Sequence, residues 1–168
     1  MFIDSSLEFA DGATVPLTAD AATENFLSIG EIDLRPAGED SDAVTPKTVD
    51  FSAGEPLYLV VEVDTAIQGT TTSYAFALFT DNVTTADDAQ SSGTKLLDTG
   101  LQAAYIAAGT RLIFALPNGG YERYLTLHGK AASNSVTVTG GTVSAFITKD
   151  VSNWTSTATR VPATDPAN

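Results

Sequence analysis

The 168-residue sequence predicts an all-β fold, an antiparallel β-sandwich or jelly roll of about eight strands followed by an extended C-terminal tail. Residues that favour strands are abundant, above all Thr and Val, while Gly and Asn mark the turns. Several short segments alternate between apolar and polar residues with the period of two expected of a strand. No segment carries a persuasive helical pattern, and many short strands without helices are typical of two packed sheets.

Along the chain, the first two predicted strands run from Ile3 to Phe9 and from Leu27 to Leu34, both with weak alternation. The clearest signal spans Leu57 to Asp64, where every odd-numbered position is Leu or Val and is predicted to face the core. Pro56 precedes this strand, a position that tolerates a residue without an N–H group. The segment from Ser73 to Thr80 is apolar on both faces, which predicts a central strand or one covered on both sides.

Further strands are predicted near Leu96 to Thr99 and at Arg111 to Leu116, with a short helical turn between them at Leu101 to Ala108. The next strand, Arg123 to His128, has two leucines that are predicted to point inward. Three of its residues are predicted to point outward, namely Tyr124, Thr126 and His128.

A hairpin is predicted around the Gly140-Gly141 dipeptide, because two glycines permit the positive φ angles of a tight two-residue turn. Pairing across this turn places Val138 opposite Val143 and Val136 opposite Ala145. All four side chains then share one face, so turn and pattern agree on one register.

The length suits a single domain, which we place at residues 1–150. Pro36 to Asp50 is polar and acidic and is predicted to be a long surface loop. Residues 151–168 are rich in Ser, Thr, Pro and Ala without sustained alternation, which predicts an extended C-terminal arm.

Charge restricts the partners of the protein. There are 8 Lys and Arg residues against 21 Asp and Glu residues, so the formal net charge is −13. Such a protein is repelled by phosphates, and we therefore expect it to bind neither nucleic acid nor an anionic membrane surface. The N-terminal residues lack the pattern of a targeting signal, and apolar runs such as Leu57 to Val61 are far too short to span a bilayer.

The sequence offers little for catalysis, and we expect no enzyme and no cofactor. There is one histidine, His128, and no cysteine, which excludes Cys-His chemistry and His-rich metal sites. Glu62, Asp64 and Glu122 leave paired-carboxylate sugar hydrolysis open as a remote alternative. The acidic run from Glu39 to Asp42 lacks the spacing of a calcium loop, so no metal site is predicted.

Candidate contact residues lie at the two ends of the chain. Trp154 is the one tryptophan and lies in the polar arm, where it either anchors the arm to its own domain or docks on a neighbouring subunit. Arg160 and Phe2 are candidates for the same kind of contact.

Four segments together resemble the small capsid cement proteins of short-tailed bacteriophages, the type known from a Bordetella phage. These are MFIDSSLEFAD at Met1 to Asp11, GEPLYLVVEVD at Gly54 to Asp64, LPNGGYERYLTL at Leu116 to Leu127 and GTVSAFITKD at Gly141 to Asp150. They occur in the order expected of that family and cover both ends and the middle of the predicted domain. The 36–50 loop and the arm are longer than in the family, so the resemblance assigns them no role.

The resemblance implies a jelly roll without catalytic activity that is made in the host cytoplasm and self-associates as a homotrimer. It also implies binding to the major capsid protein on the outer surface of an icosahedral virion. A carbohydrate- or receptor-binding module of a virion is the alternative, since jelly rolls also serve as lectins. Its aromatic platform would come from Tyr58, Tyr121 or Tyr124.

Overall fold

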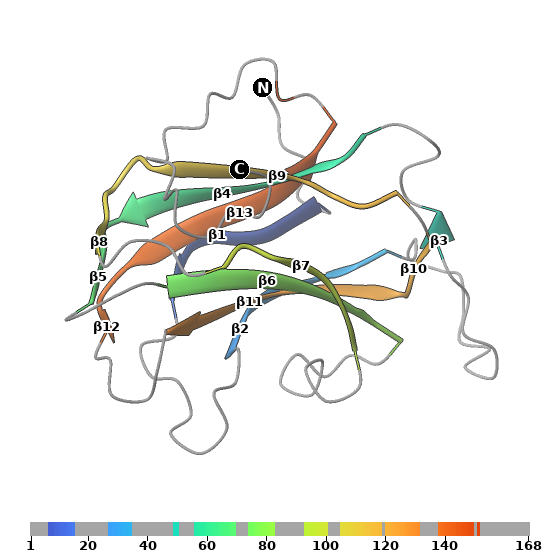
Figure 1. Ribbon diagram of the computed structural model, residues 1–168, viewed down its shortest axis with the longest axis horizontal. Coiled ribbons are helices and arrows are strands. Elements are labelled where there is room, and N and C mark those ends of the chain that lie inside the picture. The colour runs from blue at the N-terminus through green and yellow to red at the C-terminus, as the bar shows by residue number, and fades with distance from the viewer. Residues whose placement is uncertain are drawn as a thin grey trace.

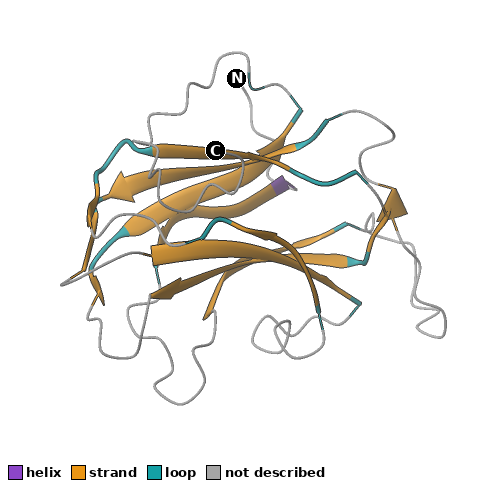
Figure 2. Cartoon of the chain, in the orientation of Figure 1, coloured by secondary structure: helices purple, strands orange, loops and turns teal. Residues whose placement is uncertain are grey.

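The chain folds into two antiparallel β-sheets that pack face to face (Figure 1). The computed structural model describes residues 7–15, 27–34, 49–50, 56–69, 74–82, 93–100, 105–118, 120–131, 138–149 and 151. Strands make up most of the described part, which contains no α-helix, and the short purple segment in Figure 2 is a 3₁₀ turn at Leu7. The predicted all-β antiparallel sandwich is therefore confirmed.

Each of the two large sheets contains four strands. The first, here called sheet A, has the order β1 (Glu8–Thr14), β13 (Thr142–Thr148), β4 (Tyr58–Thr65) and β9 (Arg111–Ala115). The second, sheet B, has the order β2 (Leu27–Asp33), β11 (Tyr124–Ala131), β6 (Tyr74–Asp81) and β7 (Thr94–Asp98). These eight strands agree with the predicted number of about eight, and five short strands in two small sheets bring the described total to thirteen.

The pairing of the eight strands is nested. The outermost pair in sequence, β1 with β13, encloses β2 with β11, which encloses β4 with β9, and β6 with β7 lies innermost. Successive nested pairs alternate between sheet A and sheet B. The core strands of both sheets therefore join residues far apart in sequence, so the sheets cannot form from local hairpins alone.

Two small sheets lie at opposite ends of the sandwich (Figure 1). One contains β12 (Val138–Thr139), β5 (Ile67–Gly69) and β8 (Tyr105–Ile106), and the other contains β10 (Gly120–Tyr121) and β3 (Val49–Asp50). The strand β8 falls within the segment for which the sequence predicts a helical turn. Within that segment, Tyr105 and Ile106 are thus extended, because their backbone pairs with Gln68 and Ile67 of β5.

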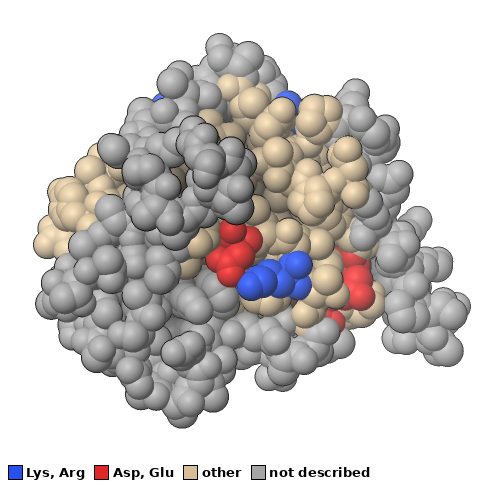
Figure 3. Space-filling model, viewed as in Figure 1, with Lys and Arg blue, Asp and Glu red and all other residues tan. Residues whose placement is uncertain are grey.

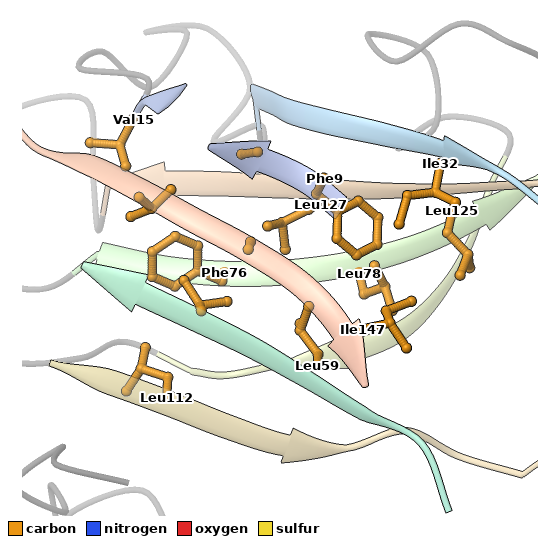
Figure 4. Close-up of a cluster of buried hydrophobic side chains, with 14 of the residues drawn as sticks. Phe9, Val15, Ile32, Leu59, Phe76, Leu78, Leu112, Leu125, Leu127 and Ile147 are labelled. Atoms are coloured by element: carbon orange, nitrogen blue, oxygen red, sulfur yellow. The ribbon is translucent and has the colours of Figure 1, made fainter. Parts of the chain in front are cut away.

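The hydrophobic core fills the space between sheets A and B (Figure 4). The odd-numbered residues of the 57–63 segment are all buried in it, at 2% exposure or less, which confirms the predicted core face of β4. Every residue of β6 is buried, as its apolar sequence on both faces predicts, and it pairs with β11 on one side and β7 on the other. Burying a Leu, Val or Phe side chain contributes about 1.5–3 kcal/mol, so this layer is the main source of stability.

The predicted hairpin around Gly140 and Gly141 is wrong. Both glycines do have positive φ, 74° and 127°, as predicted. However, Val138 pairs with Gly69 in the small sheet, and Val143 pairs with Val63 in sheet A. The two glycines turn the chain from one sheet into another because β1 and β4 already occupy both sides of β13.

Sheets A and B approach most closely where β1 passes β2. A Cβ atom on Gly30 would lie 1.9 Å from the backbone carbonyl oxygen of Phe9. Only a residue without a side chain fits at this position, so Gly30 permits the contact between β1 and β2.

Candidate functional site

The three contact residues that the sequence singles out lie outside the described residues. These are Phe2, Trp154 and Arg160. The same is true of most of the predicted acidic loop, of which only Val49 and Asp50 are described, in β3. The search for a site therefore turns to the described surface.

Tyr105 is the one described large hydrophobic side chain that is strongly exposed, at 56%. It lies in β8, in the small sheet at one end of the sandwich, and pairs with exposed Gln68 of β5. Its neighbour Ile106 points the opposite way and is buried, which fixes the outward direction of the tyrosine ring. Sequence reasoning missed Tyr105, because the expected helical turn concealed the alternation of Tyr105 and Ile106.

The tyrosines named from the sequence as a sugar-binding platform are largely unavailable. Tyr121 is 1% exposed, and its hydroxyl group donates a hydrogen bond to the carbonyl oxygen of Pro117. Tyr124 is 5% exposed and lies beneath the guanidinium of Arg123, whose Cζ is 4.7 Å from the ring centroid. Tyr58 is half-buried. An aromatic platform, if built from the described residues, would use Tyr105 instead.

His128 points away from the main core, as predicted, but it is buried. Its exposure is 0%, and its ring contacts that of Phe79 edge to face, with centroids 5.1 Å apart. Tyr124 and Thr126, on the same side of β11, are also buried. The alternation correctly assigns these residues to the face of sheet B that points away from the main core, but that face is itself covered.

The outer face of sheet A, which points away from the main core, carries polar contacts near one end. The guanidinium of Arg111 on β9 donates to the carboxylate of Glu62 on β4 at 3.1 Å. The hydroxyl group of Ser144 on β13 donates to the carboxylate of Asp64 on β4 at 2.8 Å. Glu122 lies in the connection between β10 and β11, where its N–H donates to the hydroxyl oxygen of Thr80 on β6 of sheet B at 2.8 Å. Of the carboxylates considered for sugar hydrolysis, Glu62 and Asp64 thus lie on sheet A, whereas Glu122 lies beside sheet B.

Carboxylates gather where β2, β11 and β6 run side by side. Tyr124 of β11 lies between Asp33 of β2 and Asp81 of β6 in the strand register. Arg123 forms a forked contact with Asp33, with nitrogen–oxygen distances between 2.8 and 3.2 Å. This hydrogen bond to Asp33 raises the pKa of the Arg123 guanidinium.

Two glutamates beside this group are less acidic than usual. Burial raises the pKa of Glu31, and the negative charges of Asp33 and Asp81 raise it further. Burial also raises the pKa of Glu122, with Asp81 as the second cause. Among the residues that the structure describes, an ion pair in this cluster joins Arg123 to Asp33.

On the side of the molecule seen in Figure 3, a basic group lies beside acidic ones, and most of the other described residues in view are uncharged. Among the residues that the structure describes, no three His, Cys, Asp or Glu side chains form a group able to hold a metal ion. Within the same residues there is no helix long and apolar enough to cross a membrane.

Comparison with models of known protein families and with curated proteins finds no match to this chain.

Proposed function

We propose that this protein is a bacteriophage capsid cement protein that binds the outer surface of the assembled icosahedral shell. In this role it contacts the major capsid protein, self-associates, and stabilises the shell against the internal pressure of packaged DNA. Stabilisation follows from mass action, because a protein that binds the assembled shell and not its loose subunits lowers the free energy of the assembled state. The protein is made in the host cytoplasm and performs no catalysis.

The observation that carries this proposal is the nested strand order. Four nested antiparallel pairs that alternate between two sheets, β1·β13, β2·β11, β4·β9 and β6·β7, support a jelly roll. A jelly roll is the fold that the family resemblance implies. Three of the four resembling segments fall on β4, on β10 with β11, and on β13, and the fourth, Met1 to Asp11, reaches into β1.

The charge of the chain agrees with a location outside the shell. A formal net charge of −13 disfavours contact with the packaged DNA and keeps a protein of high copy number soluble. Phe2, Trp154 and Arg160 remain our candidates for contacts with the shell or with neighbouring subunits. The homotrimer implied by the resemblance stays a prediction.

The test adds purified protein to expanded shells that lack it and measures co-sedimentation and the melting temperature of the shells. We expect saturable binding and a higher shell melting temperature. The full-length variants Trp154→Ala and Arg160→Ala should weaken binding while retaining the circular dichroism and melting temperature of the free protein. Absence of binding by a well-folded wild-type protein would contradict the proposal.

The second candidate function is a carbohydrate- or receptor-binding module of a virion, and exposed Tyr105 is the observation that favours it. Exposed aromatic rings stack on sugar rings, and Gln68 beside it offers amide hydrogen bonds. A glycan array distinguishes the two functions. Binding that is lost in Tyr105→Ser and retained in Tyr58→Phe would favour the carbohydrate-binding module, whereas shell binding unaffected by Tyr105→Ser would favour the cement protein.

A further inference from the structure

The chain enters and leaves sheet A at the same end of the sandwich. The first strand, β1, pairs antiparallel with the last, β13, and Glu8 at the start of β1 lies opposite Phe146 near the end of β13. At the other extreme of this pair, Thr14 lies opposite Thr142. The segments that precede β1 and follow β13 therefore leave the sheet side by side.

This end of the sandwich also carries the small sheet of β10 and β3, and we call it the β10 end (Figure 1). The last residue of β13, Thr148, pairs with Tyr58 at the start of β4, which in turn pairs with Ala115 at the end of β9. From there the chain reaches β10 at Gly120 within five residues. The small sheet with Tyr105 lies at the opposite end, which we call the Tyr105 end.

Covalent geometry restricts the reach of two of the contact candidates. Phe2 lies five residues before Leu7, and Trp154 lies five residues after Lys149. An extended chain spans at most about 3.6 Å per residue, so each Cα atom lies within about 18 Å of that described neighbour at the β10 end. The seven steps from Lys149 back to the start of β13 span about 23 Å. The Tyr105 end is thus beyond the reach of these Cα atoms.

The two candidates suit a protein partner. Both are large aromatic residues, and aromatic anchors that enter pockets supply much of the binding energy of protein interfaces. Two anchors that leave one end of a molecule can engage one surface together, because the second contact then forms at a high effective concentration. The net charge of −13 disfavours phosphate-rich surfaces, so the matching partner is a protein with apolar pockets.

We infer that the β10 end faces the shell and that pockets of the major capsid protein beside it take up Phe2 and Trp154. The Tyr105 end then points away from the shell. This inference rests on the proposed function and adds to it the orientation of the bound protein. A rotation axis perpendicular to the shell turns the same end of every copy toward it, so this orientation agrees with the homotrimer that the resemblance implies.

Single-cysteine variants test the orientation, because the chain has no cysteine of its own. Ala115 and Asn118 are exposed at the β10 end, and Ala108 is exposed in the turn before β9 at the Tyr105 end. Ala115→Cys and Ala108→Cys are matched substitutions at the two ends, and Asn118→Cys adds a second position at the β10 end. The rate at which a maleimide alkylates each thiol is measured for the free protein and for the protein bound to expanded shells.

Shell binding should slow the alkylation of Ala115→Cys and Asn118→Cys by about tenfold or more, because an interface excludes solvent and reagent. The rate for Ala108→Cys should stay that of the free protein. A bulky polyethylene glycol attached to the same thiols beforehand should abolish shell binding at the β10 end and leave it intact at the Tyr105 end.

The anchors are tested in the full chain with the double variant Phe2→Ala, Trp154→Ala. Its affinity for shells should fall by more than about tenfold, as expected when two interface anchors are truncated. The free protein should keep its melting temperature, since anchors for a partner contribute nothing to the fold of the unbound chain. A lowered melting temperature would mean that these residues anchor the chain to its own domain, which would overturn their assigned role.

Several results would overturn the orientation. Protection of Ala108→Cys alone, or equal protection at both ends, would contradict it. Thiols at the β10 end that are already unreactive in the free protein would mean that this end meets other copies of the chain instead of the shell. In each of these cases the protein still binds shells and the proposed function stands, whereas failure of the wild-type protein to bind shells would contradict the proposed function itself.

Discussion

Substituting Gly30 by Ala tests the closest approach between sheets A and B. The new Cβ atom would lie 1.9 Å from the carbonyl oxygen of Phe9 and 2.7 Å from its carbonyl carbon. Ordinary contact begins near 3.4 Å, so the backbones of β1 and β2 would have to separate by about 1.5 Å. The obstacle is backbone rather than a flexible side chain, and for this reason the strain cannot be relieved by a rotamer change.

The magnitude follows from the cost of overpacking. Forcing extra atoms into a packed interior costs about 1–3 kcal/mol, and a clash with backbone belongs at the upper end. A loss of about 3 kcal/mol lowers the melting temperature of a domain of this size by about 6–12 °C. Thermal unfolding followed by circular dichroism at a fixed scan rate measures this change.

Gly12→Ala provides the matched control. Gly12 has φ of 65°, but a Cβ there would meet nothing within 4 Å. Its cost is therefore that of left-handed backbone alone, about 1–2 kcal/mol. If Gly30→Ala destabilises no more than Gly12→Ala, β1 and β2 do not approach each other as the structure describes, and the reasoning fails.

Three further predictions concern charge and burial. The raised pKa values of Glu31 and Glu122 mean that the folded state holds their protons more tightly than the unfolded state. The contribution of these protons to folding stability is therefore fully present below the ordinary pKa of 4.5 and is lost as the pH rises through the raised values. The double variant with Gln at both positions should be more stable than the wild type in urea at about pH 7, and the difference should vanish near pH 4. Phe146→Ala should cost about 3–5 kcal/mol, because Phe146 is 2% exposed although it points away from the main core; a loss below about 1 kcal/mol in urea unfolding would mean that the outer face of sheet A is open in solution. The variant Glu62→Gln breaks the ion pair with Arg111, whose side chain is 34% exposed while that of Glu62 is 26% exposed. The free energy of unfolding should fall by at most about 1 kcal/mol, and by less at high salt. A larger, salt-independent fall would contradict a weak, partly exposed pair.

The candidate site was predicted less completely than the fold. The sequence directed attention to the ends of the chain and to Tyr121 and Tyr124, whereas the structure buries both tyrosines and exposes Tyr105. Residue type alone cannot distinguish them, because a tyrosine has both an apolar ring and a polar hydroxyl group and is common in either environment. The alternation of Tyr105 with Ile106 was the available signal.

The sequence by itself determined the fold class and the core face of individual strands. Alternation in the 57–63 segment and the apolar sequence of β6 specified which side chains are buried, because a strand directs successive side chains to opposite faces whatever its neighbours are. The Gly140-Gly141 dipeptide likewise specified a turn with positive φ.

Only the tertiary structure decided which strands pair and which faces are covered. The glycine turn joins β12 to β13, yet β12 pairs with β5, and β13 pairs with β1 and β4. Alternation assigned His128 to the face away from the main core, yet that face is buried. Local sequence sets backbone conformation and side-chain direction, whereas the partner of a strand and the cover of a face depend on contacts between residues far apart in the chain.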